Sequence, residues 1–403
     1  MKKMKKIKLI GRERALYITF YVFIGGSMRI AIISGEYPSE KAGGIGSVVY
    51  DLCKEFDRMN IEYTVLCTKK FERKTDKAVF LNAWGVHPLP DITFGLSFKK
   101  FLRKKKDNWD IFHFHLPSAL GPLLFSKDLK DKTLVTFHTT AEGYNKYVYQ
   151  KLPFKYLNWN EKILKLGYIK TFTFLEKIAL SNTTNVTAVS QGIREELNSF
   201  YRVDEVKVVN NGIDVSKLHA PITSEEKDKP LILYVGRLVA QKGIFLGIEA
   251  LSRIKKDFDF LIVGRGPLRN KLEEYSRKKC VPVKFLGYVK TEELYRIYSK
   301  SDILLMPSFY EGLPIVGIEG AGSGLPIAAF DGARVEDIVC EKNKELIVRT
   351  GDVKALSESI EYLLDNEYER KNIGKKNREN VLKNFNSKKM AKEYIKIYEE
   401  MMI

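Results

Sequence analysis

Two glutamates, Glu311 and Glu319, bracket the otherwise uncharged stretch EGLPIVGIE, and their spacing restricts the chemistry they could do. Eight residues of α-helix rise about 12 Å. The two carboxyl groups of a glycosidase lie closer, within about 5.5 Å for retention or about 9.5 Å for inversion. Pro314 suits the first turn of a helix, so we expect Glu311 before that helix and Glu319 within it. Because a helix N-terminus between two acids attracts phosphate, the pattern fits a nucleotide sugar, which carries hydroxyls at both ends and a diphosphate between them.

A pair of cations follows another expected strand. Arg237 and Lys242 lie five residues apart in the loop after YVG, ahead of a helix that begins near Gly243. A fork-shaped guanidinium, a point charge and helix-end N–H groups together suit a diphosphate. Surface cations are commonly only solvated, so this pair alone leaves both interpretations open.

A histidine and a glycine loop are further candidates. His138 ends the apolar run TLVTFH, and the carboxyl end of a parallel strand faces the ligand cleft. A hydrogen-bonded core histidine explains the same pattern equally well. Gly43, Gly44 and Gly46 precede a helix and would let backbone N–H groups approach an anion. They lack the GxGxxG spacing of dinucleotide sites, and a plain tight turn is the alternative.

Two patterns resemble metal sites. Asp257 and Asp259 lead directly into the run FLIVG, which places them at the amino end of a strand, away from the cleft. His113 and His115 alternate on one strand and could ligate a metal. No matching cysteine or acid cluster accompanies them, so a hydrogen-bonded structural role is favoured for at least one. We therefore expect no metal site.

Short β-rich runs alternate with helix-period segments from Met28 onward, which is typical of parallel sheets with crossover helices. The polar, proline-framed segment 219–230 has the composition of a linker. These features predict an α/β protein with two doubly wound domains facing a cleft at the carboxyl ends of their strands. The runs expected as strands are 29–34, 63–67, 110–115, 133–138 and 185–189 in the first half, and 231–236, 259–264, 283–287, 302–307 and 325–330 in the second.

The composition agrees with this organisation. A chain of 403 residues suits two domains of ordinary size, and four dispersed cysteines argue against a disulfide framework and fit a reducing compartment. The net charge of +18 is concentrated partly in 1–27 and in the run KKFLRKKK at 99–106. Such runs suit anionic lipid, phosphate or nucleic acid, and a solvated lysine-rich surface is the alternative.

Two apolar segments remain ambiguous. Residues 15–27 follow a basic stretch as in a signal peptide, but they are too short to span a bilayer, which needs about 20 apolar residues. We interpret 1–27 as a leader outside the fold, with a weak membrane anchor as the alternative. In the aromatic, lysine-rich segment 141–181, an apolar stripe at helical spacing predicts either core or a surface facing acceptor or membrane. Its residues are Ile163, Leu166, Ile169 and Phe172.

The segment EGLPIVGIEGAGSGLPIAAFD resembles the double-glutamate signature of family 4 retaining glycosyltransferases with the GT-B fold. Further matches follow in the family's order, among them YPSEKAGGIGSVVYDL, FHTTAEG, AVSQGIREEL, VVNNGID, YVGRLVAQKG and SDILLMPS. The resemblance covers 28–403. It implies an acceptor-side Rossmann-like domain over 28–220, a nucleotide-sugar-binding one over 221–385, and a last helix over 386–403 crossing back to the first domain.

The resemblance also implies roles for the site residues. Glu311 would bind hydroxyls of the transferred sugar and Glu319 those of the ribose. Arg237 and Lys242 would hold the diphosphate as charge develops on it, and His138 would lie on the reactive side of the sugar. The other donor-binding residues would be Gly44, Gly46, Gly312, Leu313, Pro314, Tyr288 and Val289. Enzymes of this family retain anomeric configuration and require no metal or other cofactor.

The chain departs from the family pattern at three positions. Arg265 stands where an acid is common. Gly320 and Gly322 lie in the expected helix where alanine and methionine are usual, and glycine there lowers helix stability.

Together these features predict a cytoplasmic, retaining hexosyltransferase that uses a UDP- or GDP-sugar and a lipid-linked or envelope polysaccharide acceptor. The basic runs favour peripheral contact with the inner face of an anionic membrane. A glycogen-type glucan synthase is the nearest alternative. A non-catalytic binder of anionic membrane or nucleic acid is an alternative of another class, although no nucleic-acid-binding module is visible.

Overall fold

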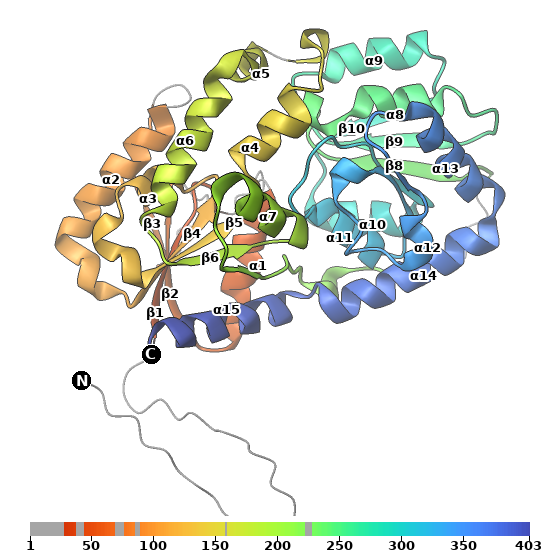
Figure 1. Ribbon diagram of the computed structural model, residues 1–403. Coiled ribbons are helices and arrows are strands. Elements are labelled where there is room, and N and C mark those ends of the chain that lie inside the picture. Colours follow the sequence, from red (N-terminus) through yellow and green to blue (C-terminus); the bar gives the residue numbers. More distant parts are fainter. Residues whose placement is uncertain (1–27, 38–43, 69–75, 85–88, 158, 222–227) are drawn as a thin grey trace, which may run out of the picture.

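The computed structural model describes residues 28–37, 44–68, 76–84, 89–157, 159–221 and 228–403. The expected leader, the residue Gly43 and half of the expected linker, 222–227, lie outside these ranges. The described chain forms two α/β domains, each built on one parallel sheet (Figure 1). The predicted fold class, two Rossmann-like domains in the GT-B arrangement, is thereby confirmed.

The N-terminal sheet has seven strands in the order β3-β2-β1-β4-β5-β6-β7, and every pair is parallel. Its strands are β1 (Arg29–Ile33), β2 (Glu62–Cys67), β3 (Ala78–Phe80), β4 (Ile111–Leu116), β5 (Thr133–Phe137), β6 (Asn185–Ala188) and β7 (Val206–Val208). Helices cover both faces of such a sheet, so its central strands are buried throughout. All six residues of β4 are accordingly buried, two histidines included.

The C-terminal sheet has six parallel strands in the order β10-β9-β8-β11-β12-β13. They are β8 (Leu231–Val235), β9 (Asp259–Val263), β10 (Val283–Gly287), β11 (Ile303–Met306), β12 (Ile327–Phe330) and β13 (Ile347–Val348). All ten predicted strands are confirmed, with ends that differ by at most two residues. The short strands β3, β7 and β13 were not predicted, because two or three residues carry no recognisable alternation.

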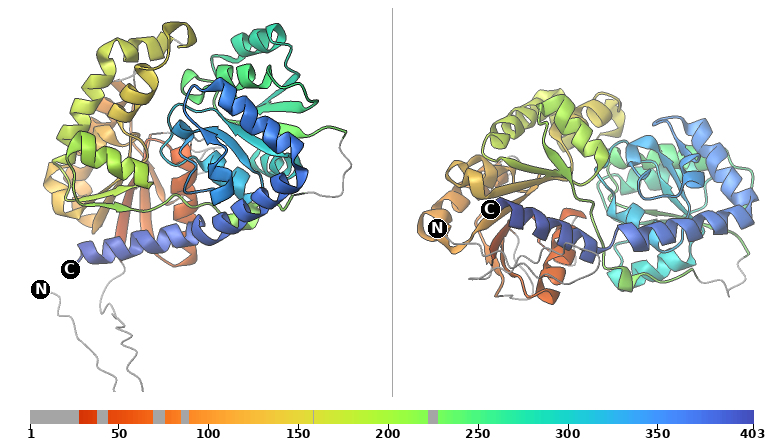
Figure 2. Two further views of the ribbon diagram at one scale, coloured as in Figure 1. Left: turned by 45° about the vertical axis from the view of Figure 1, so that its right-hand side comes forward. Right: turned by 60° about the horizontal axis from the view of Figure 1, so that its bottom comes forward.

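Fifteen α-helices within the described ranges connect and cover the strands (Figure 2). Those of the first domain are α1 (Gly44–Arg58), α2 (Leu89–Lys105), α3 (Leu120–Leu124), α4 (Ala141–Tyr144), α5 (Trp159–Ile163), α6 (Ile169–Leu180) and α7 (Gln191–Glu196). Those of the second are α8 (Ile244–Leu251), α9 (Arg269–Lys278), α10 (Thr291–Lys300), α11 (Ile315–Gly322), α12 (Glu341–Lys344), α13 (Val353–Asp365) and α14 (Glu367–Asn384). None of these described helices combines the length and apolarity that a membrane crossing requires.

The last helix, α15 (Ser387–Met401), runs from the second domain along the first (Figures 1 and 2). Its Tyr398 hydroxyl lies 2.7 Å from Nδ1 of His113, and its Tyr394 hydroxyl lies 3.1 Å from Oγ1 of Thr136. The Ser387 hydroxyl donates to the buried Glu55 carboxylate of α1 at 2.7 Å. The chain's final turns therefore complete the core of its first domain.

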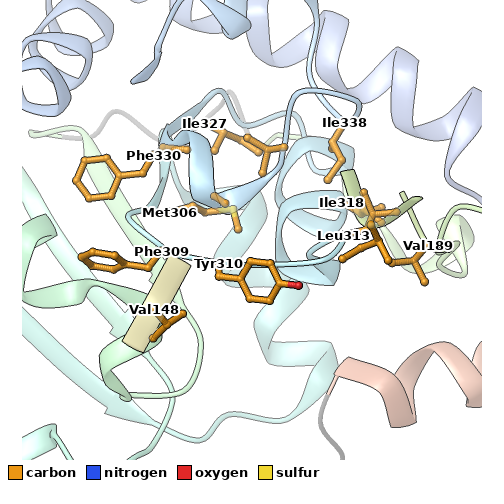
Figure 3. Packing of buried hydrophobic residues seen from close by; sticks show 14 of the residues in the cluster. Val148, Val189, Met306, Phe309, Tyr310, Leu313, Ile318, Ile327, Phe330 and Ile338 are labelled. Atoms are coloured by element: carbon orange, nitrogen blue, oxygen red, sulfur yellow. The ribbon is translucent and has the colours of Figure 1, made fainter. Parts of the chain in front are cut away.

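One apolar core continues across the boundary between the domains. Figure 3 shows Val148 and Val189 of the first domain with Phe309, Tyr310 and Leu313 of the second. The loop after β11 therefore packs against the N-terminal domain as well as against its own.

The apolar stripe of 141–181 divides in the structure. Ile169 is 7% exposed and belongs to the core, whereas Ile163 and Leu166 are 44% and 76% exposed. The core interpretation is wrong for these two residues, because the segment between α5 and α6 turns sharply at Gly167 (φ 115°). A single straight helix would have kept the stripe on one face.

Candidate active site

The two predicted cations lie in the loop that leaves β8. Lys242 forms an ion pair with Glu311, and these side chains are 17% and 12% exposed. Lys242 is followed by Gly243, whose φ of 63° is left-handed. A Cβ there would lie 1.8 Å from the carbonyl oxygen of Pro307, so only glycine lets this loop approach the end of β11. The close approach brings the cation loop to the first glutamate.

Glu311 precedes α11 and Glu319 lies inside it, as predicted. Pro314 is the N-cap residue of α11, and the Glu311 N–H donates to the Gly332 carbonyl at 2.9 Å. The helix N-terminus therefore lies between the two carboxylates. This order, with a carboxylate on each side of the helix start, is the one that the sequence predicted for binding an extended ligand.

Glu319 is held by two tyrosines of α10. The hydroxyls of Tyr295 and Tyr298 donate to its two carboxylate oxygens at 3.2 and 3.1 Å. Burial raises the pKa of Glu319 to about 7, against the lowering effect of these two donors. The negative charge of Asp51 on α1 raises it further, so Glu319 faces the first helix of the other domain. Neither tyrosine was predicted as a site residue from the sequence.

Gln241 joins three loops of the site and was not predicted. Its Nε2 donates to the Tyr310 carbonyl at 2.6 Å, and its Oε1 accepts from the Tyr144 hydroxyl at 3.0 Å. Tyr144 comes from α4 of the first domain, where burial raises its pKa to about 12. The glutamine thus links the cation loop, the residue before Glu311 and the N-terminal domain.

The N-terminal domain contacts the segment EGLP (311–314) closely and donates hydrogen bonds to it. A Cβ on Gly312 would lie 1.7 Å from the carbonyl oxygen of His138, so this contact requires glycine. The Ser190 hydroxyl donates to the Gly312 carbonyl at 2.8 Å, and Asn211 Nδ2 donates to the Leu313 carbonyl at 3.1 Å. Ser190 and Asn211 lie in the motifs AVSQG and VVNNG, which could have identified them only by resemblance. These bonds bring His138, Glu311 and Lys242 to one boundary.

Three histidines lie in a row under this contact. Nε2 of His138 lies 3.1 Å from Nδ1 of His115, whose ring centroid is 4.1 Å from that of His113. His113 bonds Tyr398 and Thr136 at 2.7 Å each, which confirms the structural role expected for at least one histidine. Burial lowers the pKa of His113 and of His138 to about 3, and that of His115 well below its ordinary value. All three rings are therefore neutral near pH 7.

The second metal-like pattern lies away from the site. Asp259 begins β9, and Asp257 pairs with Lys229 at 3.3 Å on the surface. Their predicted position at the amino end of the strand is confirmed. Across the residues that the structure describes, no set of three His, Cys, Asp or Glu side chains is arranged to hold a metal ion.

The remaining predicted residues flank the boundary. Gly44 is the first residue of α1, and Gly46 lies buried in its first turn. Among the described residues, no atom outside Gly44's own neighbours and the adjoining helix backbone lies within 4 Å of a Cβ built on Gly44. Tyr288 follows β10 and is 38% exposed, with the Arg265 guanidinium 5.6 Å from its ring centroid. Val289 is half-buried beside it. Arg265, at the position where the resemblance led us to expect an acid, therefore lies over the ring of the tyrosine expected near the base.

Beside this site, a charged network that the sequence did not reveal connects side chains of the two domains. Glu196 of α7 accepts from the hydroxyls of Thr140 and Tyr310 at 2.6 and 2.7 Å. Its other carboxylate oxygen pairs with Arg334, which adopts the left-handed φ of 53°. The Arg334 guanidinium also lies 4.8 Å from the Tyr310 ring centroid. Nothing local marks these residues, because Glu196 lies more than a hundred positions before Tyr310 and Arg334 in the chain.

Two parallel α/β domains that meet at a double-glutamate segment, a cation loop and a histidine define a glycosyltransferase of the GT-B class. Comparison with known families agrees with this class. Residues 42–217 match the model of Glycosyltransferase Family 4, and residues 216–380 match that of Glycosyl transferases group 1. The chain belongs to this family of glycosyltransferases.

Its relatives are distant but align over most of their length. An uncharacterised glycosyltransferase of Methanocaldococcus jannaschii is 24% identical over 93% of this chain and 99% of its own. Glycogen synthase of Mycobacterium tuberculosis is 23% identical, with 84% and 86% covered. The structure of sucrose-phosphate synthase from Thermosynechococcus elongatus superposes with a TM-score of 0.77 at 21% identity, covering 93% of this chain and 99% of that one. That last likeness shows the shared fold.

Proposed function

We propose that this protein is a retaining, metal-independent hexosyltransferase that uses a UDP- or GDP-sugar and a lipid-linked or envelope polysaccharide acceptor. The observation that carries the proposal is the ion pair between Lys242 and Glu311 at the N-terminus of α11. A carboxylate and a cation at one helix start suit a sugar hydroxyl and the phosphate next to it.

Different residues at the domain boundary bind different parts of the donor. Glu311 accepts hydrogen bonds from the transferred sugar, while Lys242 and Arg237 neutralise the diphosphate. Glu319, held by Tyr295 and Tyr298, accepts from the ribose hydroxyls. Backbone N–H groups at Gly44 and Gly46 and at Gly312, Leu313 and the start of α11 add to the anion site, and Tyr288 with Val289 packs near the base.

The same contacts support the chemistry. Negative charge grows on the leaving diphosphate as the glycosidic bond breaks, and cations placed there stabilise the transition state more than the ground state. The departing phosphate oxygen takes the proton of the attacking acceptor hydroxyl on the same face of the sugar. The anomeric configuration is then retained without a carboxylate nucleophile.

The test is a screen of nucleotide sugars against wild type, Glu311→Gln and Glu341→Gln, followed by assignment of the product anomer by NMR. Glu341 is a matched control, because its side chain is 89% exposed and pairs with Lys344 on α12. We expect Glu311→Gln to lower kcat by about 10²–10³, the usual loss for one transition-state contact. Undiminished transfer by that variant, or an inverted product, would overturn the proposal.

Membrane contact is the part of the proposal that concerns the acceptor. Lys100, Lys104 and Lys106 are exposed at the end of α2 and just after it, and α3 packs between α2 and α6. Several large apolar side chains of α2, of α6 and of the segment 154–166 are also exposed. They are Ile92, Leu96, Phe154, Ile163, Leu166, Phe174 and Ile178, with exposed fractions between 41% and 76%. Apolar side chains among lysines suit the interface of an anionic bilayer, where a lipid-linked acceptor would lie.

Vesicle sedimentation tests this contact. Changing Lys100, Lys104 and Lys106 together to Ser should weaken binding to phosphatidylglycerol vesicles, and Leu166→Asp should weaken it at high salt as well. The control changes Lys354, Lys371 and Lys375 to Ser, exposed lysines of α13 and α14. Equal binding by both triple variants would contradict a docking face on the N-terminal domain.

A glycogen-type glucan synthase is the second candidate, and the relationship to a glycogen synthase favours it. It predicts elongation of soluble glycogen from ADP- or UDP-glucose without any membrane. A non-catalytic binder predicts no hydrolysis or transfer with any donor. The donor screen therefore separates a non-catalytic binder from both enzymes, and elongation of soluble glycogen separates the two enzymes from each other.

A further inference from the structure

The histidine row beneath the domain boundary contains a group that the proposed mechanism does not use. His115 lies on β4, in register with Thr136 of β5, and His138 follows the end of β5. This register brings the two imidazoles together, with Nδ1 of His115 3.1 Å from Nε2 of His138. Both side chains are buried, at 0% and 6% exposed. Because His138 touches Gly312 through its backbone, whatever orients its ring acts next to Glu311.

The bond between these rings has a direction. A neutral imidazole carries one N–H donor and one acceptor nitrogen, and the partner of one nitrogen decides which of the two is protonated. Burial keeps both rings neutral near pH 7 by lowering the pKa of each. The hydrogen bond therefore runs either from Nδ1–H of His115 to Nε2 of His138 or in the opposite sense.

The outer nitrogens distinguish the two directions. Nε2 of His115 is buried without a partner, whereas Nδ1 of His138 has no protein partner among the described residues and is the nitrogen left for a ligand. If His138 were the donor, His115 would carry its proton on Nε2 and bury an unpaired N–H. Orphaned buried N–H groups are rarer than unused acceptors. Donation from His115 buries only an unused lone pair.

We propose that His115 is a positioning residue that donates its Nδ1–H to His138 and so holds His138 as the Nδ1–H tautomer. His138 then presents a fixed N–H donor to the oxygen-rich ligand beside Glu311, in place of an acceptor. A wrong tautomer at such a position leaves the geometry intact but removes the useful hydrogen bond. The kinetic consequence rests on the proposed function, whereas the tautomer itself does not.

The direct test is NMR of the full chain labelled with 15N in its histidine rings, which number five in the sequence. His138→Gln identifies the His138 signals by their loss. We expect the wild-type protein to show Nδ1 of His138 protonated and Nε2 unprotonated. The opposite pattern would overturn the proposal whether or not any sugar donor is turned over.

Two substitutions of His115 provide the matched comparison. The amide nitrogen of His115→Asn is attached to Cγ, as Nδ1 is, so it keeps a donor in place, whereas His115→Leu removes it. We expect His115→Leu to lose the single tautomer and to lower kcat about 10- to 100-fold, the usual effect of losing an orienting partner, with the donor KM nearly unchanged. His115→Asn should restore both the tautomer and most of kcat.

A purely structural role for His115 predicts a different outcome. The two variants would then lose melting temperature without any change in the His138 tautomer or in kcat. That result, or a single unaltered tautomer in His115→Leu, would overturn the proposal. If wild type turns over no sugar donor, the proposed function fails while the NMR comparison still decides the role of His115.

Discussion

Glu196 of the N-terminal domain and Arg334 of the C-terminal domain form an ion pair across the boundary, with side chains 4% and 17% exposed. The same carboxylate accepts from Thr140 and Tyr310. Thr140 lies two residues after His138, and Tyr310 immediately precedes Glu311. One carboxylate thus sets the distance between the loops that carry two predicted site residues.

Glu196→Gln should therefore destabilise the protein by about 3 kcal/mol, because removing one partner of a buried pair leaves the other charge uncompensated. The double variant Glu196→Gln/Arg334→Gln should recover part of this loss. Urea denaturation measures the free energy of unfolding, with Glu341→Gln as a surface control that costs below about 1 kcal/mol. Equal losses in Glu196→Gln and the control would show that the pair does not hold the domains.

Gly312→Ala should impair transfer without loosening the rest of the fold. The added Cβ would lie 1.7 Å from the His138 carbonyl oxygen, so the two loops must separate. A displacement of about 1 Å near the chemistry can lower the rate about 100-fold. Gly192→Ala is the control, since its Cβ would lie 3.4 Å from Arg334. Steady-state kinetics with the donor found in the screen provides the comparison, and equal rates would contradict the contact.

Nucleotide affinity should rise with pH through about 7 in the wild-type protein. Burial raises the pKa of Glu319 to about 7, and only the ionised carboxylate accepts from both ribose hydroxyls. Calorimetric titration of UDP and GDP between about pH 5 and pH 9 measures the affinity. Glu319→Gln should show a smaller rise, because the terminal phosphate, whose second pKa is about 6, also contributes to it. Identical pH profiles in the two proteins would rule out Glu319 as the ribose ligand.

Glu319 also makes the free energy of unfolding depend on pH, in a direction that follows from its raised pKa. An acid whose pKa is raised in the folded state binds more protons there than in the unfolded chain. The free energy of unfolding therefore falls as the pH increases from about 4.5 to about 7. Glu319→Gln should show a smaller fall over this interval. Burial also raises the pKa of Glu176 to about 7. Glu176 should therefore account for the fall in the free energy of unfolding that remains in Glu319→Gln.

Gly320→Ala should lower stability even though alanine is the better helix former by about 1 kcal/mol. A Cβ on Gly320 would lie 2.4 Å from Cδ2 of Leu304, a fully buried residue of β11. The smaller side chain of Leu304→Val should make the substitution tolerable, so the two changes should be non-additive in thermal unfolding. Additive effects would show that packing does not explain this departure from the family pattern.

Local sequence was sufficient for the longer strands, whereas β3, β7 and β13, with two or three residues each, were not predicted. Buried parallel strands such as TLVTFH and DILLMP are short apolar runs between turn residues, and that pattern survives without any tertiary information. The same holds for Pro314, whose preference for a helix start placed Glu311 outside α11 and Glu319 inside it. Failure came at Ile163 and Leu166, where the turn at Gly167 interrupts the periodicity on which the core interpretation depended.

Sequence by itself determined the fold class, the family and the identity of the main candidates, because each depends on residue type and short-range order. Only the tertiary structure decided which partners those candidates meet. Glu196 meets Arg334, Ser190 holds Gly312, and His115 meets His138 because strand register and domain contact bring distant positions together. Such contacts leave no trace in spacing along the chain, since their geometry is set by how two sheets are wound and packed.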